Sequence, residues 1–153
     1  MKKRIIIISL IALFADLLTK FVVFSSNKIN TAKSVIKGFF YILPTKNNGA
    51  AFSSFAGYQI FLILISLAIL TYLIYISFKQ QKGKLSTVSY GLLIGGLLGN
   101  LFDRIVFHYV RDFISIHLFK YEFAIFNIAD ICIVVGAIIL IWLSFVGDKK
   151  YEN

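Results

Sequence analysis

The sequence predicts an all-α membrane protein, a four-helix transmembrane bundle with a small extended, β-containing segment in an outer loop. Hydrophobic residues make up 59% of the 153 residues and charged residues make up 15%, against roughly 25% charged residues in a soluble domain. Four long apolar runs recur along the chain, and one connecting segment is rich in β-branched and aromatic residues. This composition excludes a water-soluble globular domain.

The apolar runs cover residues 4–24, 57–78, 85–105 and 126–147, and each can cross about 30 Å of hydrocarbon at about 1.5 Å per residue. We expect a single integral membrane domain over residues 1–153, with outer loops at 25–56 and 106–125. The basic residues 2–4 at the start of the first run are typical of a cleaved signal peptide, but Asp16 interrupts the run and no small-residue cleavage site follows Phe24. We therefore expect this run to be retained as a helix.

The basic residues favour contact with lipid over contact with nucleic acid. The formal net charge is +9, but these residues form short groups beside the apolar runs rather than one face. Three groups lie on one side of the predicted bundle and contain Lys2, Lys3, Arg4, Lys79, Lys82, Lys84, Lys149 and Lys150. Because Lys and Arg favour cytoplasmic flanks, both termini and the middle loop are expected to face the cytoplasm. The outer loops are also basic, which weakens this signal.

Polar residues of the predicted helices collect near the outer surface of the membrane. The chain has only seven acidic residues, and a carboxylate at the centre of a membrane helix costs at least about 2.5 to 3.5 kcal/mol. Such residues therefore usually face a partner, a cavity or a reaction. With the expected topology, three helices place polar groups at one depth, namely Asp16, Lys20, Asn100, Asp103, Arg104, Asn127 and Asp130. The shared depth indicates one site at the outer face.

Two of the helices carry polar pairs with the spacing of one helix face. Asp16 and Lys20 are four residues apart, so they can neutralise each other, either as an ion pair that holds the bundle together or in a chemical role. Asn100 and Arg104 have the same spacing, and Asp103 lies beside them. We expect this second cluster to orient other polar groups by hydrogen bonds.

The third run also contains a stripe of small residues. Gly91, Gly95 and Gly99 recur every four residues, so they lie along one face of a helix. Small residues in this pattern allow the backbone of another helix to approach closely. The stripe therefore predicts tight helix packing.

The first outer loop contains SVIKGFFYILPT at residues 34–45. The β-branched and aromatic residues around Pro44 predict an extended or surface-lying segment rather than a fifth span. An ordinary outer loop with an aromatic belt and a platform in contact with substrate both fit this pattern.

Asp112 in the second outer loop and Asp130 at the start of the fourth helix form a candidate pair. They are too far apart to be neighbours on one helix, but a loop that returns to the membrane brings them together. Two close carboxylates in a poorly solvated site tend to share one proton, which provides one base to activate water and one acid to polarise a carbonyl. Asn127, three residues before Asp130, is placed to orient it. By spacing alone, a structural or ion-handling role remains open.

Other signatures of catalysis are missing from the sequence. His108 and His117 lack an HExxH context and a Cys partner, and Cys132 is the single cysteine. The serines lack GxSxG or SxxK contexts, and neither a Walker loop nor GxGxxG is present. We expect no metal and no cofactor. The rival classes are a small transporter or proton-handling channel, whose polar groups would extend through the membrane, and a non-catalytic scaffold.

Five short motifs together resemble the bacterial lipoprotein signal peptidase family, also called signal peptidase II. They are DLLTK at residues 16–20, NNGAAF at 47–52, GNLFDR at 99–104, VRDF at 110–113 and FNIAD at 126–130. Each motif is weak alone, but their order and spacing match across nearly the whole chain.

The resemblance implies an aspartic endopeptidase of the bacterial cytoplasmic membrane, with its active site toward the outer face, and we expect the protein to be a monomer. Its partners would be membrane lipids and diacylglyceryl-modified prolipoproteins, which it would cut before the lipidated cysteine. The family's catalytic pair falls on Asp112 and Asp130. The positions that support the site or bind substrate fall on Asp16, Lys20, Asn47, Gly49, Asn100, Asp103, Arg104 and Asn127.

One residue departs from the family pattern, because Arg111 stands where many relatives carry an apolar residue. A guanidinium directed at the Asp112 carboxylate would favour its ionised form and make Asp112 the base. If Arg111 instead reaches lipid head groups, it has no such effect.

Overall fold

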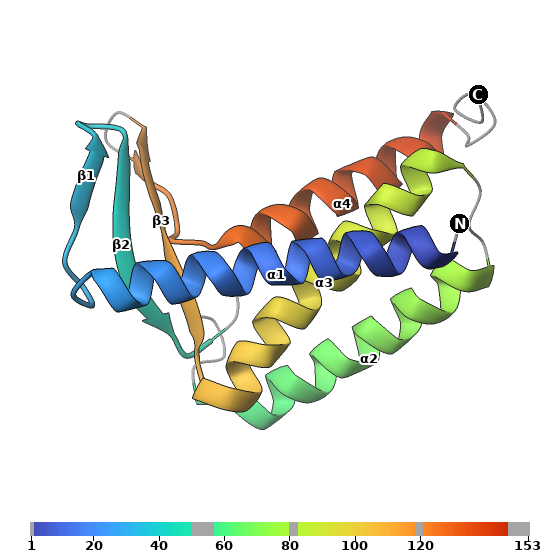
Figure 1. Ribbon diagram of the computed structural model, residues 1–153, viewed down its shortest axis with the longest axis horizontal. Coiled ribbons are helices and arrows are strands. Elements are labelled where there is room, and N and C mark those ends of the chain that lie inside the picture. Colours follow the sequence, from blue (N-terminus) through green and yellow to red (C-terminus); the bar gives the residue numbers. More distant parts are fainter. Residues whose placement is uncertain (1, 50–56, 80–82, 119–120, 147–153) are drawn as a thin grey trace.

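The computed structural model describes residues 2–49, 57–79, 83–118 and 121–146, which form four helices and a four-stranded antiparallel sheet (Figure 1). The helices are α1 (Lys2–Ser26), α2 (Gln59–Lys79), α3 (Lys84–Phe107) and α4 (Ile128–Val146). The strands are β1 (Lys33–Ile36), β2 (Phe40–Asn47), β3 (Val110–Leu118) and β4 (Tyr121–Glu122). All four helices are long and apolar enough to span a membrane.

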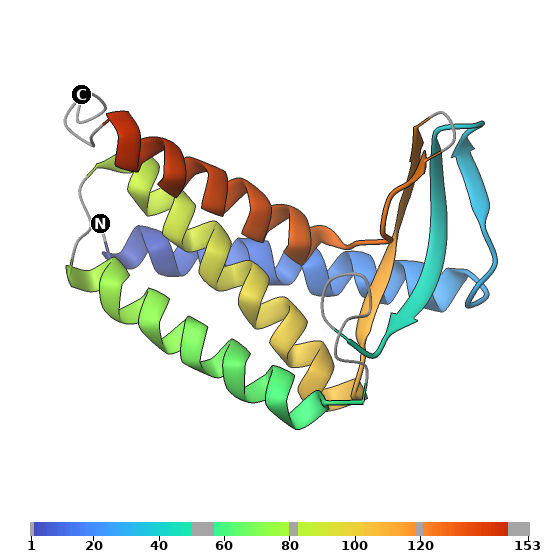
Figure 2. The same cartoon turned by 180° about the vertical axis from the view of Figure 1, so that it is seen from behind.

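Helix α3 forms the centre of the bundle and packs against each of the other three helices (Figure 2). In its apolar stretch 67% of the residues are buried, against 28% in α1 and 17% in α2 and α4. The outer helices therefore direct most of their apolar side chains away from the protein, as expected of helices surrounded by lipid. Since α3 has little contact with lipid, it can carry the polar residues of the bundle.

Glycines allow the helices to approach α3 closely, as the sequence predicts. A Cβ atom on Gly95 would lie 2.6 Å from the carbonyl oxygen of Ser9 in α1. Gly96, outside the predicted stripe, faces α4, where a Cβ atom would lie 2.5 Å from the carbonyl oxygen of Ala129. A side chain at either position would force the helices apart. The glycines thus bring the polar ends of three helices within hydrogen-bonding distance.

The sheet lies at one end of the bundle (Figure 1), and its strands follow the order β1, β2, β3, β4. The first outer loop provides β1 and β2, so the extended segment predicted around Pro44 is confirmed. The second outer loop provides β3, and for this reason the description as all-α is too narrow. In β3, Val110, Ile114 and Ile116 are β-branched, but their strand structure depends on pairing with β2 from the other loop. The sequence of one loop alone therefore does not predict that pairing.

A small apolar cluster attaches the sheet to the bundle. Val23 of α1 packs with Phe113 and Ile114 of β3, and all three side chains are buried. Because this cluster fixes the first half of β3 against α1, it also fixes the height of Asp112 above the helices.

The basic residues that the structure describes in the predicted cytoplasmic groups lie at the end of the bundle opposite the sheet. Lys2, Lys79 and Lys84 occupy helix ends remote from the sheet (Figure 2). The remaining members of the predicted groups at the ends of the second and fourth spans, Lys82, Lys149 and Lys150, lie outside the described residues.

We predict that Gly96→Ala lowers the free energy of unfolding by about 1 to 3 kcal/mol, because the added methyl group overpacks the contact between α3 and α4. Unfolding by an anionic detergent in mixed micelles measures this change. Thr71→Ala, on the exposed face of α2, is the control. Equal unfolding midpoints for the two variants would contradict the proposed packing.

Candidate active site

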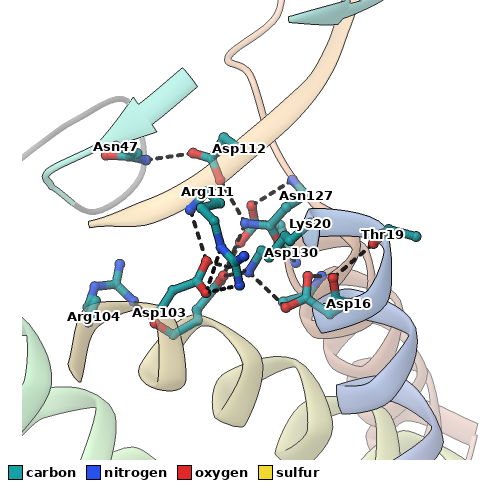
Figure 3. A network of polar contacts seen from close by, with 12 residues as sticks. Asp16, Thr19, Lys20, Asn47, Asp103, Arg104, Arg111, Asp112, Asn127 and Asp130 are labelled. Atoms are coloured by element: carbon teal, nitrogen blue, oxygen red, sulfur yellow. Dashed lines mark hydrogen bonds and ion pairs between the residues drawn. The ribbon is translucent and has the colours of Figure 1, made fainter. Parts of the chain in front are cut away.

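Asp112 and Asp130 lie in one cavity and are joined by the side chain and backbone of Asn127 (Figure 3). The Nδ2 atom of Asn127 donates to Oδ1 of Asp112 over 2.6 Å. The backbone N–H of Asn127 donates to Oδ2 of Asp130 over 3.2 Å. The return of the second outer loop, expected from the sequence, is thus made by strand β3, and it places the first carboxylate beside the second.

Asn127 is held by the start of α4. Its Oδ1 atom accepts from the backbone N–H of Asp130 over 3.0 Å, while Asp130 accepts from the backbone N–H of Asn127. This reciprocal pattern has the form of a capping box, in which two N–H groups at the helix start are satisfied by side chains. Because Oδ1 is engaged in the cap, the amide presents its Nδ2 donor to Asp112.

Asn100 holds the other side of Asp130. Its Nδ2 atom donates to Oδ1 of Asp130 over 2.7 Å. Its Oδ1 atom accepts from Nζ of Lys20 over 3.1 Å and from Nδ2 of Asn127 over 3.0 Å. Since Lys20 is only a donor, it fixes which end of the Asn100 amide faces the aspartate.

Asp112 is buried with its carboxylate between two amide donors. Asn47 on β2 donates from Nδ2 to Oδ2 of Asp112 over 2.9 Å, and Asn127 donates to the other oxygen. Burial, together with the nearby charge of Asp130, raises the pKa of Asp112 to about 7, although the two amide bonds act in the opposite direction. The net result is a carboxyl group that gains or loses its proton near neutral pH.

Gly49 positions Asn47, and Arg104 forms part of the cavity wall. The backbone N–H of Gly49 donates to Oδ1 of Asn47 over 2.9 Å, so that the Nδ2 atom of Asn47 faces Asp112. The guanidinium of Arg104, at the end of α3, donates to the carbonyl of Gly49 over 3.1 Å. Arg104 also lines the cavity, so it places a positive charge near both aspartates.

Beneath the aspartates lies a buried network of two acids and two bases. Nζ of Lys20 lies 2.7 Å from Oδ2 of Asp16 and 3.1 Å from Oδ2 of Asp103. Arg111 pairs with Asp103 at 2.7 Å. Asp16 also accepts the backbone N–H of Ala129 over 2.9 Å, which satisfies a free donor in the first turn of α4. The four charges balance, which reduces the cost of burying them.

The direction of Arg111 differs from both sequence-based expectations. Its guanidinium and its backbone N–H both bind the carboxylate of Asp103, and its side chain lies over the ring of Phe107 at 4.4 Å. Successive residues of a strand point to opposite faces, so Arg111 points away from Asp112. The inference that Arg111 makes Asp112 the base therefore loses its premise. The sequence contains no signal for this pairing, which depends on how β3 leaves α3.

Three hollows that share lining residues adjoin the aspartates. The central cavity, about 260 Å³, is lined by both aspartates together with Asn47, Asn100 and Arg104. A second hollow of about 390 Å³ lies on the Asp112 side, and it is called the polar hollow here because Thr45, Asn47 and Glu122 line it beside apolar residues. An apolar hollow of about 380 Å³ lies on the Asp130 side, against α4.

The histidines lie outside this constellation. His108 ends α3 with a left-handed backbone conformation, and His117 on β3 contacts Ser115 and the ring of Tyr41. Over residues 2–49, 57–79, 83–118 and 121–146, no three His, Cys, Asp or Glu side chains are grouped as metal ligands would be. The ten residues named for the site all meet around the central cavity or in the network beneath it.

Comparisons with known proteins agree on one family. A family model described as Signal peptidase (SPase) II matches residues 8–146. A lipoprotein signal peptidase of Listeria monocytogenes serotype 4a is 37% identical over 148 residues, which cover 96% of this chain and 96% of that protein. A lipoprotein signal peptidase of Clostridium tetani is 39% identical over 150 residues, which cover 97% of this chain and 96% of that protein.

Solved structures resemble the whole fold. One structure, described as a bacterial membrane enzyme determined by the in meso method at 2.3 Å resolution, has a TM-score of 0.87 and 35% identity, and covers 97% of this chain and 92% of that chain. A second, described in the same way at 1.9 Å resolution, has a TM-score of 0.84 and 35% identity, and covers 94% and 93% of the two chains. These comparisons do not support the transporter alternative.

We predict that Arg111→Met costs roughly 3 kcal/mol of stability, because it leaves the buried carboxylate of Asp103 with Lys20 as its remaining ion-pair partner among the described residues. Detergent unfolding of Arg111→Met, Asp103→Asn and the double variant measures the coupling. The double variant should lose less than the two single variants combined. Strictly additive losses would contradict the ion pair, and Lys33→Met, on exposed β1, is the control.

Proposed function

This chain belongs to the signal peptidase II family, and we propose that Asp112 and Asp130 are its catalytic pair. The protein is therefore a protease that removes signal peptides from prolipoproteins. The observation that supports the pair most strongly is its geometry, because two carboxylates line one cavity and are joined through Asn127. We further propose that the cut falls just before the diacylglyceryl-modified cysteine.

In the proposed mechanism the pair holds one proton. Asp112 carries that proton in the free enzyme, because burial and the charge of Asp130 favour its neutral form. Asp130, which accepts N–H groups from Asn100 and Asn127, is the base that takes a proton from the attacking water. As the water oxygen bonds to the scissile carbonyl carbon, Asp112 donates its hydrogen bond to the carbonyl oxygen. The carbon–nitrogen bond then breaks as the carbonyl re-forms, the proton on Asp130 passes to the leaving amine, and Asp112 keeps its proton for the next cycle.

The surrounding residues hold this geometry. Asn47, Asn100 and Asn127 direct amide donors at the two carboxylates, so the carboxylates are already oriented before substrate arrives. Arg104 adds a positive charge at the cavity wall, where it favours negative charge on the carbonyl oxygen as the tetrahedral intermediate forms. Lys20, Asp16 and Asp103 act through the amides and the start of α4 rather than on the substrate.

The lipid-linked substrate is proposed to enter sideways from the membrane. The apolar hollow beside Asp130 adjoins α4, whose residues Ile131, Val134 and Val135 are exposed as lipid-facing side chains are. We propose that the sheet and the active site face outward and that both termini face the cytoplasm, because Lys2, Lys79 and Lys84 lie at the opposite end of the bundle. We also propose that residues 1–153 form one membrane domain and that the protein is a monomer.

We predict that Asp112→Asn and Asp130→Asn each lower kcat on a purified diacylglyceryl-modified prolipoprotein by about 100 to 10,000-fold, because each removes one member of the acid–base pair. Loss of the signal peptide from the substrate is the measurement. Lys33→Gln is the control, since it also removes one charge but lies on exposed β1 and lines none of the three hollows. Full turnover by either Asn variant would exclude the assigned pair.

We predict that kcat/KM falls by about tenfold per pH unit above about pH 7, as the pair loses the proton held by Asp112.

The raised pKa of Asp112 also affects the stability of the protein. Because the pKa of Asp112 in the folded protein lies above its ordinary value of 3.8, the folded state binds more protons than the unfolded chain, and stability declines as pH rises from about 4 to about 7. Unfolding of the wild type and of Asp112→Asn between these pH values measures the effect. A decline of equal size in the variant would assign it to another group.

A further inference from the structure

The segment that joins β4 to α4 contributes lining residues to all three hollows of the site. Ala124 lines the central cavity, the polar hollow and the apolar hollow. Of its neighbours, Phe123 lines only the two outer hollows, and Ile125 lines only the central cavity and the polar hollow. Ala124 therefore marks the point at which a group seated between the aspartates can continue to either side.

Backbone hydrogen bonds fix this point in space. On one side of Ala124, the N–H of Phe123 donates to the carbonyl of Ile116 over 2.9 Å. On the other side, Phe126 and Ile114 exchange bonds of 3.0 and 2.8 Å. Since β3 holds the chain at both ends of this short segment, the backbone has little freedom to withdraw from a larger side chain at position 124.

The two outer hollows differ in chemistry. The polar hollow is rimmed by Thr45, Asn47 and Glu122, which suit a peptide backbone that continues toward water. The apolar hollow is lined by Phe126, Val134 and Val135 and continues into the exposed apolar face of α4. A substrate residue that carries both a peptide chain and a lipid has one suitable exit for each.

We propose that Ala124 is a specificity-determining residue whose small side chain leaves room for the glyceryl lipid to pass from the central cavity into the apolar hollow. This role rests on the proposed function of the site, and it identifies the residue that limits the size of the lipid group that the site accepts. An acyl chain gains little hydrophobic free energy on moving from bilayer to an apolar hollow, because both surroundings are apolar. Selection at this point is therefore steric and depends on the volume at residue 124.

The test compares two substrates that share one prolipoprotein sequence, one with a diacylglyceryl cysteine and one with a monoacylglyceryl cysteine. Cleavage gives kcat/KM, and non-cleavable peptides with the same two lipids give inhibition constants. One additional methylene in a fitted pocket changes the ratio of the kcat/KM values for two substrates by about 10 to 200-fold. We expect Ala124→Leu to lower kcat/KM and to weaken inhibition for the diacyl form by at least about tenfold more than for the monoacyl form.

Three further variants separate the effect of side-chain volume at residue 124 from effects of polarity or of a general loss of folding. Ala124→Val should give a smaller change in the same direction, and Ala124→Ser should leave the preference unchanged. Ala68→Leu makes the same substitution on the exposed face of α2 and should alter the cleavage of neither substrate. Unfolding midpoints show which variants are folded, and Ala124→Val decides the matter if Ala124→Leu does not fold.

The outcomes separate the role of Ala124 from the function on which it rests. If the wild type cleaves the diacyl substrate while the folded variants at position 124 lose activity equally on both substrates, or keep the wild-type preference, the role of Ala124 is overturned and the function stands. If the wild type cleaves neither substrate, the proposed function itself fails.

Discussion

The side-chain amide of Asn127 is the group on which the arrangement of the site depends. Its oxygen caps α4, and its nitrogen donates to Asp112 and to Asn100. Because an amide has one acceptor end and one donor end, the cap decides that the donor end faces the cavity. The Asn127 amide thereby joins the start of α4 to β3. A carboxylate or a hydroxyl does not offer the same fixed acceptor at one end and donor at the other.

Burial of the charged groups costs free energy, and it also gives Asp112 a pKa suited to catalysis. Asp16, Lys20 and Asp103 are fully buried, and charges in such surroundings are stable only when they are paired and hydrogen-bonded. The network satisfies that requirement with balanced charge and leaves Asn100 held in one orientation by Lys20. The same burial acts on Asp112, where it raises the pKa into the range in which a carboxyl group can serve as an acid at neutral pH.

Much of the site was predictable because membrane insertion makes polar residues conspicuous. The depth of Asp16, Asn100 and Asp130 follows from helix length, and the family motifs add the loop residues that depth alone does not reveal, such as Asn47 and Gly49. The pairing of β3 with β2 was not predictable, since it joins two loops that are distant in sequence. Arg111 was misplaced for the same reason, because its direction is fixed only when the strand register is known.

The proposed chemistry requires a buried carboxyl pair that holds a single proton near neutral pH. Infrared difference spectroscopy of the protein in lipid, recorded across a pH titration, detects that proton through the carbonyl stretch of a protonated carboxyl group. We expect a band that disappears with an apparent pKa of about 7 in the wild type and is missing from Asp112→Asn. A wild-type protein without such a band, or an Asp112→Asn variant that retains it unchanged, would show that Asp112 does not hold the proton.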